Sequence, residues 1–244
     1  MLFWKKKSPE KVSLDWLHAD MHSHLVAGID DGAADVATAV ALIREMKSLG
    51  YGKIVTTPHV LWELYPNTTA TIQQGAARVQ QALDAEGIDI DYHAAAEYYM
   101  DEHFAGLLQK KEPLLTIGGN MVLVEFSMIT APFDLQEMLF EMQLQHYQPV
   151  IAHPERYAYL KHRKEFFEEL RHNGCLFQLN LLSLTGHYGH TVQELAEYLV
   201  KGDFYDFAGT DLHGERHLAG LQQLGGSPLL RRLKESGRLK NATL

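Results

Sequence analysis

The sequence predicts an α/β fold, a barrel of seven strands related to the TIM type. Three observations support this prediction. Short apolar runs alternate with amphipathic stretches, as in repeated βα units that build a parallel sheet. No linker, low-complexity tract or internal repeat divides the chain. A length of 244 residues suits one large domain, so we expect a single domain over residues 1–244.

Seven short apolar runs predict buried strands, because parallel strands covered on both faces are almost continuously apolar. They are Leu14–Met21, Lys53–Thr57, Ile88–Ala95, Met121–Phe126, Pro149–Ala152, Leu176–Asn180 and Tyr205–Ala208.

Amphipathic stretches between these runs predict helices. In the first stretch Val36, Val40, Ile43 and Met46 share one face, and Gly50 ends it as a helix C-terminus should. The expected helices are Asp35–Leu49, Thr69–Ala85, Asp134–His146, Arg163–Asn173 and Thr191–Val200.

Charge and composition exclude several classes of protein. A formal charge of -9 argues against a nucleic-acid binder or a binder of anionic membranes. One cysteine, Cys175, permits no intramolecular disulfide. The segment Met1–Lys11 has too few consecutive apolar residues to form the core of a signal peptide. The sequence also lacks the run of about 18 apolar residues that a membrane-spanning helix needs. A cytoplasmic location is therefore expected.

Potential metal ligands occur where the expected strands end, which is where barrels of this type place their chemistry. His22 and His24 are spaced two apart on an extended segment, so both imidazoles point to one side. The turn Gly28–Gly32 can return a carboxylate, Asp31, to the same place. An HxH pair alone is a weak signal, and each histidine could simply lie in the core or at the surface.

The other strand ends repeat this pattern. Six of the seven deliver at least one ligand, and the additional candidates are His59, Glu97, Glu125, His153, Asp211 and His213. Glu125 interrupts an apolar run, where an unpaired carboxylate would cost several kcal/mol. A salt bridge to a nearby Lys or Arg is the structural alternative for that residue.

Nine ligands exceed the needs of one catalytic ion, which uses about three protein ligands plus water. With carboxylate bridging they suit two or three ions, and a nitrogen and oxygen set without thiolate favours Mn, Fe or Zn. Three divalent ions against four carboxylates leave a net charge of +2, or +1 with a bridging hydroxide. Such a pocket attracts a phosphate dianion, and paired metals support in-line displacement at phosphorus.

These residues resemble the PHP (polymerase and histidinol phosphatase) superfamily, and within it the bacterial capsule-regulating tyrosine-protein phosphatases. The resemblance runs from about Leu14 to Leu218. It rests on Asp20-Met21-His22-Ser23-His24, Gly28-Ile29-Asp30-Asp31-Gly32, Thr57-Pro58-His59, Glu97, Glu125, His153-Pro154-Glu155-Arg156 and Asp211-Leu212-His213.

The resemblance implies a distorted seven-stranded barrel with three metals, often manganese. One ion would be held by His22, His24, Glu97 and Asp211, a second by Glu97, Glu125 and His153, and a third by Asp31, His59 and His213. It also implies a cytoplasmic phosphatase acting on the tyrosine-rich tail of a membrane-bound kinase that controls polysaccharide export. A homo-oligomer is an allowed state.

The hypothetical mechanism is attack of a metal-bridging hydroxide on phosphorus while Arg156, helped by Arg216, holds non-bridging oxygens. Arg156 could instead be a surface arginine that caps the next helix. In the family the second phosphate-binding arginine comes later after the Asp-x-His motif than Arg216 does here. Tyr65, Tyr98 and Tyr99 are candidates for an aromatic entrance.

A cysteine-based mechanism is disfavoured, because an arginine six residues after Cys175 is missing and position 181 is Leu181. The thiol is expected to be a small buried residue. Two alternative functions stay open: a phosphomonoesterase for a small molecule such as histidinol phosphate, and a catalytically silent scaffold that binds a kinase and uses metals for stability.

Overall fold

The computed structural model describes residues 12–244, so the expectation about Met1–Lys11 lies outside the described residues. All strand pairs in this part of the chain are parallel. The strands are β1 (Ala19–Asp20), β2 (Lys53–Thr56), β3 (His59–Val60), β4 (Asp91–Ala94), β5 (Glu97–Tyr99), β6 (Met121–Glu125), β7 (Gln148–Ala152), β8 (Leu176–Asn180) and β9 (Phe207–Gly209).

These strands form two sheets, a three-stranded one of order β1-β2-β4 and a curled six-stranded one of order β3-β5-β6-β7-β8-β9. The α/β fold with a parallel sheet is confirmed. A single barrel of seven strands is not confirmed, because the strands form two sheets and two of the expected strands are each followed by a further short strand in the other sheet. The segment Lys53–Thr57 contains β2, which belongs to the three-stranded sheet, and the chain then enters the six-stranded sheet as β3. In the same way Ile88–Ala95 contains β4 of the first sheet and is followed by β5 of the second.

Pro58 explains the first of these divisions. A proline has no N–H to donate, so the hydrogen-bond ladder of β2 cannot continue through it. His59 then pairs with Glu97 at the start of β3 and β5. The sheet change therefore places two polar residues side by side at the point where the two sheets separate.

The segment after β1 joins the two sheets at the carboxyl ends of their strands. The amide of Asp211 donates to the carbonyl of His22 (2.7 Å), and the amide of His24 donates to that of Leu212 (2.9 Å). Ser23 and Leu212 form an isolated parallel bridge, and the amide of Thr57 donates to the Ser23 carbonyl. The residues that follow β1 thus contact both sheets.

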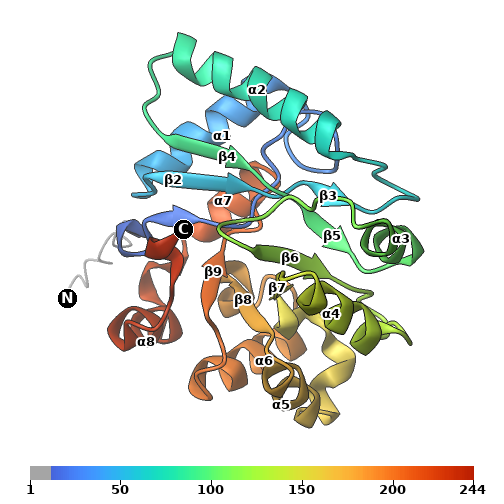
Figure 1. Cartoon of the computed structure of the whole chain (residues 1–244). Coiled ribbons are helices and arrows are strands. Elements are labelled where there is room, and N and C mark those ends of the chain that lie inside the picture. The colour runs from blue at the N-terminus through green and yellow to red at the C-terminus, as the bar shows by residue number, and fades with distance from the viewer. Residues whose placement is uncertain (1–11) are drawn as a thin grey trace, which may run out of the picture.

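Eight helices surround the sheets in the described chain. They are α1 (Val36–Ser48), α2 (Thr69–Ala85), α3 (Glu102–Lys110), α4 (Leu135–Leu144), α5 (Glu165–His172), α6 (His190–Lys201), α7 (Glu215–Leu221) and α8 (Pro228–Ser236). Figure 1 shows α1 and α2 beside β2 and β4, with α4, α5 and α6 at the opposite end near β6, β7 and β8.

All five expected helices are present, within two residues of the expected bounds at each end, and α3, α7 and α8 were not expected. The start of α1 is fixed by Asp35, whose side chain accepts from the amide of Thr38. The expected strand Leu14–Met21 is wrong over most of its length. It contains a 3-10 turn over Asp15–Leu17 and a left-handed His18, which leave only β1.

Two groups of apolar side chains hold this arrangement. A large cluster fills the space between the sheets and the helices. A smaller one occupies the concave side of the strands and includes Met21, Val55, Leu123, Val150 and Phe207. The concave side is therefore packed with side chains, and open space remains only beyond the carboxyl ends of the strands.

Asn241 links β1 to β9 at their other end. Its Nδ2 donates to the carbonyls of Ala19 and Ala208, and its Oδ1 accepts from the amide of Ala208. The side chain is only 1% exposed, so these backbone groups have no access to water.

Asn241→Ala is expected to lower the free energy of unfolding by about 3 kcal/mol, because it leaves buried backbone groups without partners. Denaturant unfolding would measure this change. Thr243→Ala, a change of an exposed residue in the same turn, is the control and should alter stability by less than about 0.5 kcal/mol. An Asn241→Ala protein as stable as the control would contradict the proposed link between the strands.

Candidate active site

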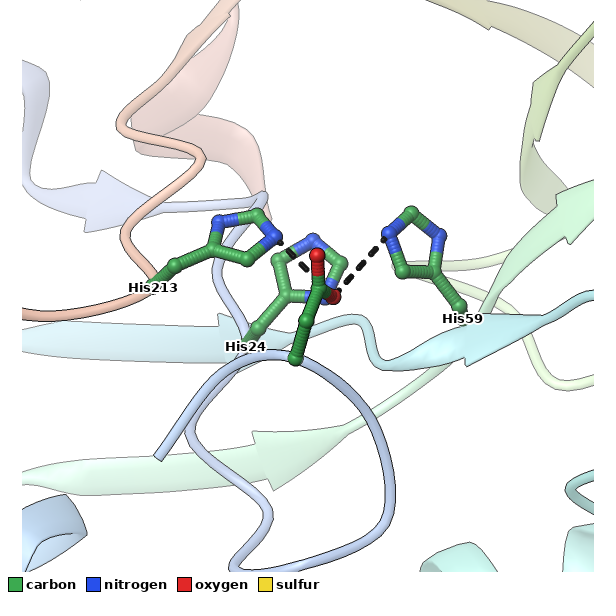
Figure 2. A group of neighbouring side chains, drawn as sticks. His24, His59 and His213 are labelled. Atoms are coloured by element: carbon green, nitrogen blue, oxygen red, sulfur yellow. Dashed lines mark ion pairs between the residues drawn. The ribbon is translucent and has the colours of Figure 1, made fainter. Parts of the chain in front are cut away.

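The structure brings all nine expected ligands together at the carboxyl ends of the strands. Each comes from a strand end or from the segment that follows it, and together they are His22, His24, Asp31, His59, Glu97, Glu125, His153, Asp211 and His213. Figure 2 shows the rings of His24, His59 and His213 facing a common centre. The side chains expected at the strand ends therefore do lie close together.

The first group contains two histidines and two carboxylates. His22 Nε2 lies 3.2 Å from Glu97 Oε2 and 3.3 Å from Asp211 Oδ1. His24 Nε2 lies 3.3 Å from the same Asp211 oxygen and 3.5 Å from Glu97 Oε2. His22, His24 and Asp211 thus offer three atoms within 4.8 Å of one another, and Glu97 Oε2 lies beside both histidines.

The second group is centred on the two glutamates. His153 Nε2 lies 3.1 Å from Glu97 Oε1 and 3.7 Å from Glu125 Oε2. His59 Nδ1 lies 3.2 Å from Glu97 Oε2 and also 3.2 Å from Glu125 Oε1.

The third group shares His59. Asp31 Oδ1 lies 3.6 Å from His59 Nε2 and 3.5 Å from His213 Nε2. His59 therefore presents one ring nitrogen to the second group and the other to the third. The resemblance implied only the third for this residue.

These residues fit divalent ions. Ligand bonds of about 2.0–2.2 Å place two ligands of one ion roughly 3–3.5 Å apart, close to the separations found here. His59 Nδ1 is buried and has no hydrogen-bond partner among the described residues, although two carboxylate oxygens lie beside it. An ion between these groups would satisfy all three. The donor set of imidazole and carboxylate suits Mn, Fe or Zn.

Hydrogen bonds on the far side of the rings orient two of the histidines. His22 Nδ1 donates to Gln178 Oε1 (2.9 Å), which also accepts from the amide of His153. His24 Nδ1 lies 2.8 Å from Asp30 Oδ2. These contacts leave both Nε2 atoms directed at the cluster, as is usual for metal-binding histidines.

Gln178 and Asp30 had no expected role. A polar residue inside the apolar run Leu176–Asn180 was the available signal for Gln178, and the motif Gly28–Gly32 was the signal for Asp30. Gly32 is required by close approach, since a Cβ there would lie 2.1 Å from the carbonyl oxygen of His24. The loop that carries Asp30 and Asp31 is thereby packed against His24.

The charges of the cluster stabilise one another. Burial opposes a charge on His22, but Glu97 and Asp211 outweigh it and raise the pKa of His22 to about 9. The hydrogen bond to His213 is the main reason that the pKa of Asp31 falls to about 2. The pKa values of Glu97 and Asp211 lie well below their ordinary values despite burial, because of His22 and neighbouring histidines. In the metal-free protein, protons on histidines thus balance ionised carboxylates.

A cavity of about 560 Å³ opens above the cluster, and Arg156 forms part of its wall. Arg156 Nη1 donates to Asp211 Oδ2 (2.8 Å), and its guanidinium carbon lies 4.5 Å from the centre of the Tyr188 ring. Tyr99, Phe126, Met128 and Ile129 supply apolar and aromatic surface around it. The cavity thus combines an anion-binding group with a surface suited to an aromatic ring.

Arg216 does not line this cavity. It lies exposed on α7, and His217, one residue later, lines the cavity in its place. His217 Nδ1 lies 3.0 Å from the carbonyl oxygen of Asp211. The expected second phosphate-binding arginine is therefore not at the site in this structure.

The expected aromatic entrance is only partly assembled. Tyr99 lines the cavity, and Tyr65 stacks on the ring of His59 with centroids 5.5 Å apart. Tyr98 points away from the cavity, because alternate residues of a strand face opposite sides and its hydroxyl accepts from the amide of Leu115.

Cys175 lies just before β8 and is buried outside the cavity. Burial raises the pKa of its thiol to about 12, so the thiolate needed for nucleophilic attack is scarce at neutral pH.

The fold and the site define an α/β protein with a cluster of metal ligands at the carboxyl ends of its strands. The family described as "Capsular polysaccharide synthesis, CpsB/CapC" matches residues 18–223, and the chain belongs to this family. None of the helices in residues 12–244 has the length and apolar character needed to cross a bilayer.

Relatives in the family are tyrosine-protein phosphatases. The tyrosine-protein phosphatase YwqE of Bacillus subtilis is 27% identical over 194 residues, which cover 80% of this chain and 76% of that protein. CpsB of Streptococcus agalactiae is 28% identical over 201 residues, covering 80% of this chain and 82% of that protein.

A crystal structure from a study of YwqE from Bacillus subtilis and CpsB from Streptococcus pneumoniae, described as unique metal-dependent tyrosine phosphatases, has a TM-score of 0.77 at 26% identity. The match covers 91% of this chain and 94% of that one. An amidohydrolase from Mycoplasma synoviae, 13% identical with a TM-score of 0.53, covers 98% of this chain and 89% of that one and shares the fold alone.

Metal affinity is expected to rise with pH between about 6 and 9. Because the pKa of His22 is raised from 6.5 to about 9, that ring is protonated at neutral pH in the metal-free protein, and an incoming ion must displace the proton. Competition titrations of Mn²⁺ at several pH values would measure the affinity. An affinity that is constant over this range would contradict the assignment of His22 as a ligand.

Proposed function

We propose that this protein is a metal-dependent protein-tyrosine phosphatase. The observation that carries the proposal is the position of Arg156, which lies beside the nine-residue cluster and inside an open cavity with aromatic walls. Cations, a guanidinium group and aromatic surface are together what an aryl phosphate requires. Family membership and the names of the relatives support the same activity.

The proposed cofactor is a set of three divalent ions, with manganese favoured. The first group (His22, His24, Glu97, Asp211) would hold one, Glu97, Glu125 and His153 a second, and Asp31, His59 and His213 a third. When bound, such ions activate water at neutral pH and neutralise charge on a transferring phosphoryl group. Glu97 would bridge two ions, since its Oε1 faces His153 and its Oε2 faces His22.

Arg156 is proposed to orient the phosphate. Nη1 is held by Asp211, which fixes the guanidinium plane and leaves its remaining N–H groups for phosphate oxygens. The same bond holds Asp211 with its other oxygen toward His22 and His24. The phenolate leaving group, whose conjugate acid has a pKa of about 10, needs little help from a general acid.

The proposed substrate is a phosphotyrosine-containing protein, namely the tail of the tyrosine kinase that controls capsular or exopolysaccharide export. The description of the family as one of capsular polysaccharide synthesis supports this choice. A substrate of this kind is consistent with the proposed cytoplasmic location. The proposal also allows a homo-oligomer.

The purified protein is expected to hydrolyse a phosphotyrosine peptide much faster than histidinol phosphate, because aromatic and apolar side chains line its cavity beside Arg156 and the acidic groups there belong to the proposed metal cluster. Activity should disappear with a chelator and return with Mn²⁺. Release of inorganic phosphate measures each rate. Faster turnover of histidinol phosphate would favour a small-molecule phosphomonoesterase, and a metal-loaded protein that hydrolyses no aryl phosphate would favour a scaffold.

His22→Ala and Asp211→Ala are each expected to lower kcat by at least about a thousandfold. Each change removes a metal ligand from the first group and leaves the charges of the neighbouring side chains uncompensated. Cys175→Ser is the matched change outside the cavity and should retain most of the activity. Circular dichroism would establish that all three variants are folded. A folded but inactive Cys175→Ser protein would contradict the metal-dependent mechanism.

A further inference from the structure

Tyr188 lies at the cavity wall, in the segment between β8 and α6. The chain turns over residues 186–189, where the amide of Gly189 donates to the carbonyl of Gly186 (2.9 Å) and both glycines have a positive φ. This turn places the Tyr188 ring under Arg156 and its hydroxyl next to Asn180, the last residue of β8. Tyr188 thus contacts both Arg156 and Asn180 at the cavity wall.

The hydrogen bonds of Asn180 determine whether the Tyr188 hydroxyl donates to it or accepts from it. Asn180 Oδ1 accepts from the amide of Leu182, so its Nδ2 is the donor to its other partners. One N–H goes to Asp211 Oδ2 (2.7 Å) and the other to the Tyr188 hydroxyl oxygen (3.0 Å). The hydroxyl therefore accepts from Asn180, and its own proton has no acceptor assigned among residues 12–244.

Of the residues that line the cavity in the described chain, Arg156 is the one lysine or arginine, and Arg216 lies outside. A transferring phosphoryl group carries charge on three non-bridging oxygens. The guanidinium of Arg156 lies over the Tyr188 ring. Arg156 donates directly to Asp211, and the Tyr188 hydroxyl is linked to the same carboxylate through Asn180.

We propose that the Tyr188 hydroxyl donates a hydrogen bond to a non-bridging phosphate oxygen and forms with Arg156 a two-residue phosphate clamp. The inference rests on the proposed phosphatase function and deepens it. Tyr188 would thus provide the second phosphate contact that was expected from Arg216. A neutral donor in that place stabilises the charged oxygen without adding a second cation beside the bound metal ions.

Tyr188→Phe removes the hydroxyl and keeps the ring under Arg156. We expect kcat/KM for a phosphotyrosine peptide to fall by about tenfold or more, the loss typical of a hydrogen bond to a charged group. The dissociation constant of inorganic phosphate, measured by calorimetry on the manganese-loaded protein, should rise by a similar factor. Unchanged values of both quantities would overturn the proposal.

Tyr198→Phe is the matched control, because this tyrosine lies on α6 outside the cavity and makes its ring contact with Lys164. It should leave rate and phosphate affinity unchanged. Metal content should be equal in both variants and the wild type. Loss of metal from Tyr188→Phe would overturn the proposal in favour of an indirect role through Asn180 and Asp211.

The leaving group distinguishes the two oxygens that Tyr188 could contact. With a non-bridging contact, Tyr188→Phe should slow phenyl phosphate and p-nitrophenyl phosphate by the same factor. A much larger effect on phenyl phosphate, which has the poorer leaving group, would place the contact on the leaving oxygen and overturn the proposal. A wild-type protein inactive on all these substrates would instead remove the proposed phosphatase function itself.

Discussion

The structure depends on the balance of charge among four carboxylates at one end of the sheets, three of them buried and one, Asp31, half-exposed. Each of these carboxylates lies within about 4 Å of a histidine nitrogen, and Glu97, Glu125 and Asp211 have little access to water. Four ionised groups at this spacing repel one another unless cations lie between them. The fold therefore has to keep donors close enough for cations to link them, and most features of the site follow from that requirement.

The division into two sheets is one of those features. Pro58 interrupts the ladder, and the chain enters the second sheet with His59 opposite Glu97. The segment after β1 is then held by bonds to both sheets, which places His22 and His24 over the same centre. Backbone pairing, rather than side-chain flexibility, fixes the positions of the donors.

Polar residues around the cluster connect metal binding to substrate binding. Gln178 holds His22 and the backbone of His153 through one oxygen, and Asn180 holds Asp211 and Tyr188 through one amide nitrogen. Both residues lie on β8, two positions apart on the same face. A single strand thus orients ligands of the cluster and the group proposed to contact phosphate.

The sequence alone determined the fold class, the order of the βα units and the nine candidate ligands, because each ligand follows an apolar run and strand ends gather at one edge. It could not determine the division of the strands between two sheets, which depends on pairing between distant segments. For the same reason the family resemblance placed His59 in one group, although its two nitrogens face two groups, and Arg216 was expected at the site, although it lies exposed on α7. The position of Tyr188 depends on a loop turn and on contacts with Asn180 and Arg156. Such contacts exist only after the chain has folded, so only the tertiary structure decided them.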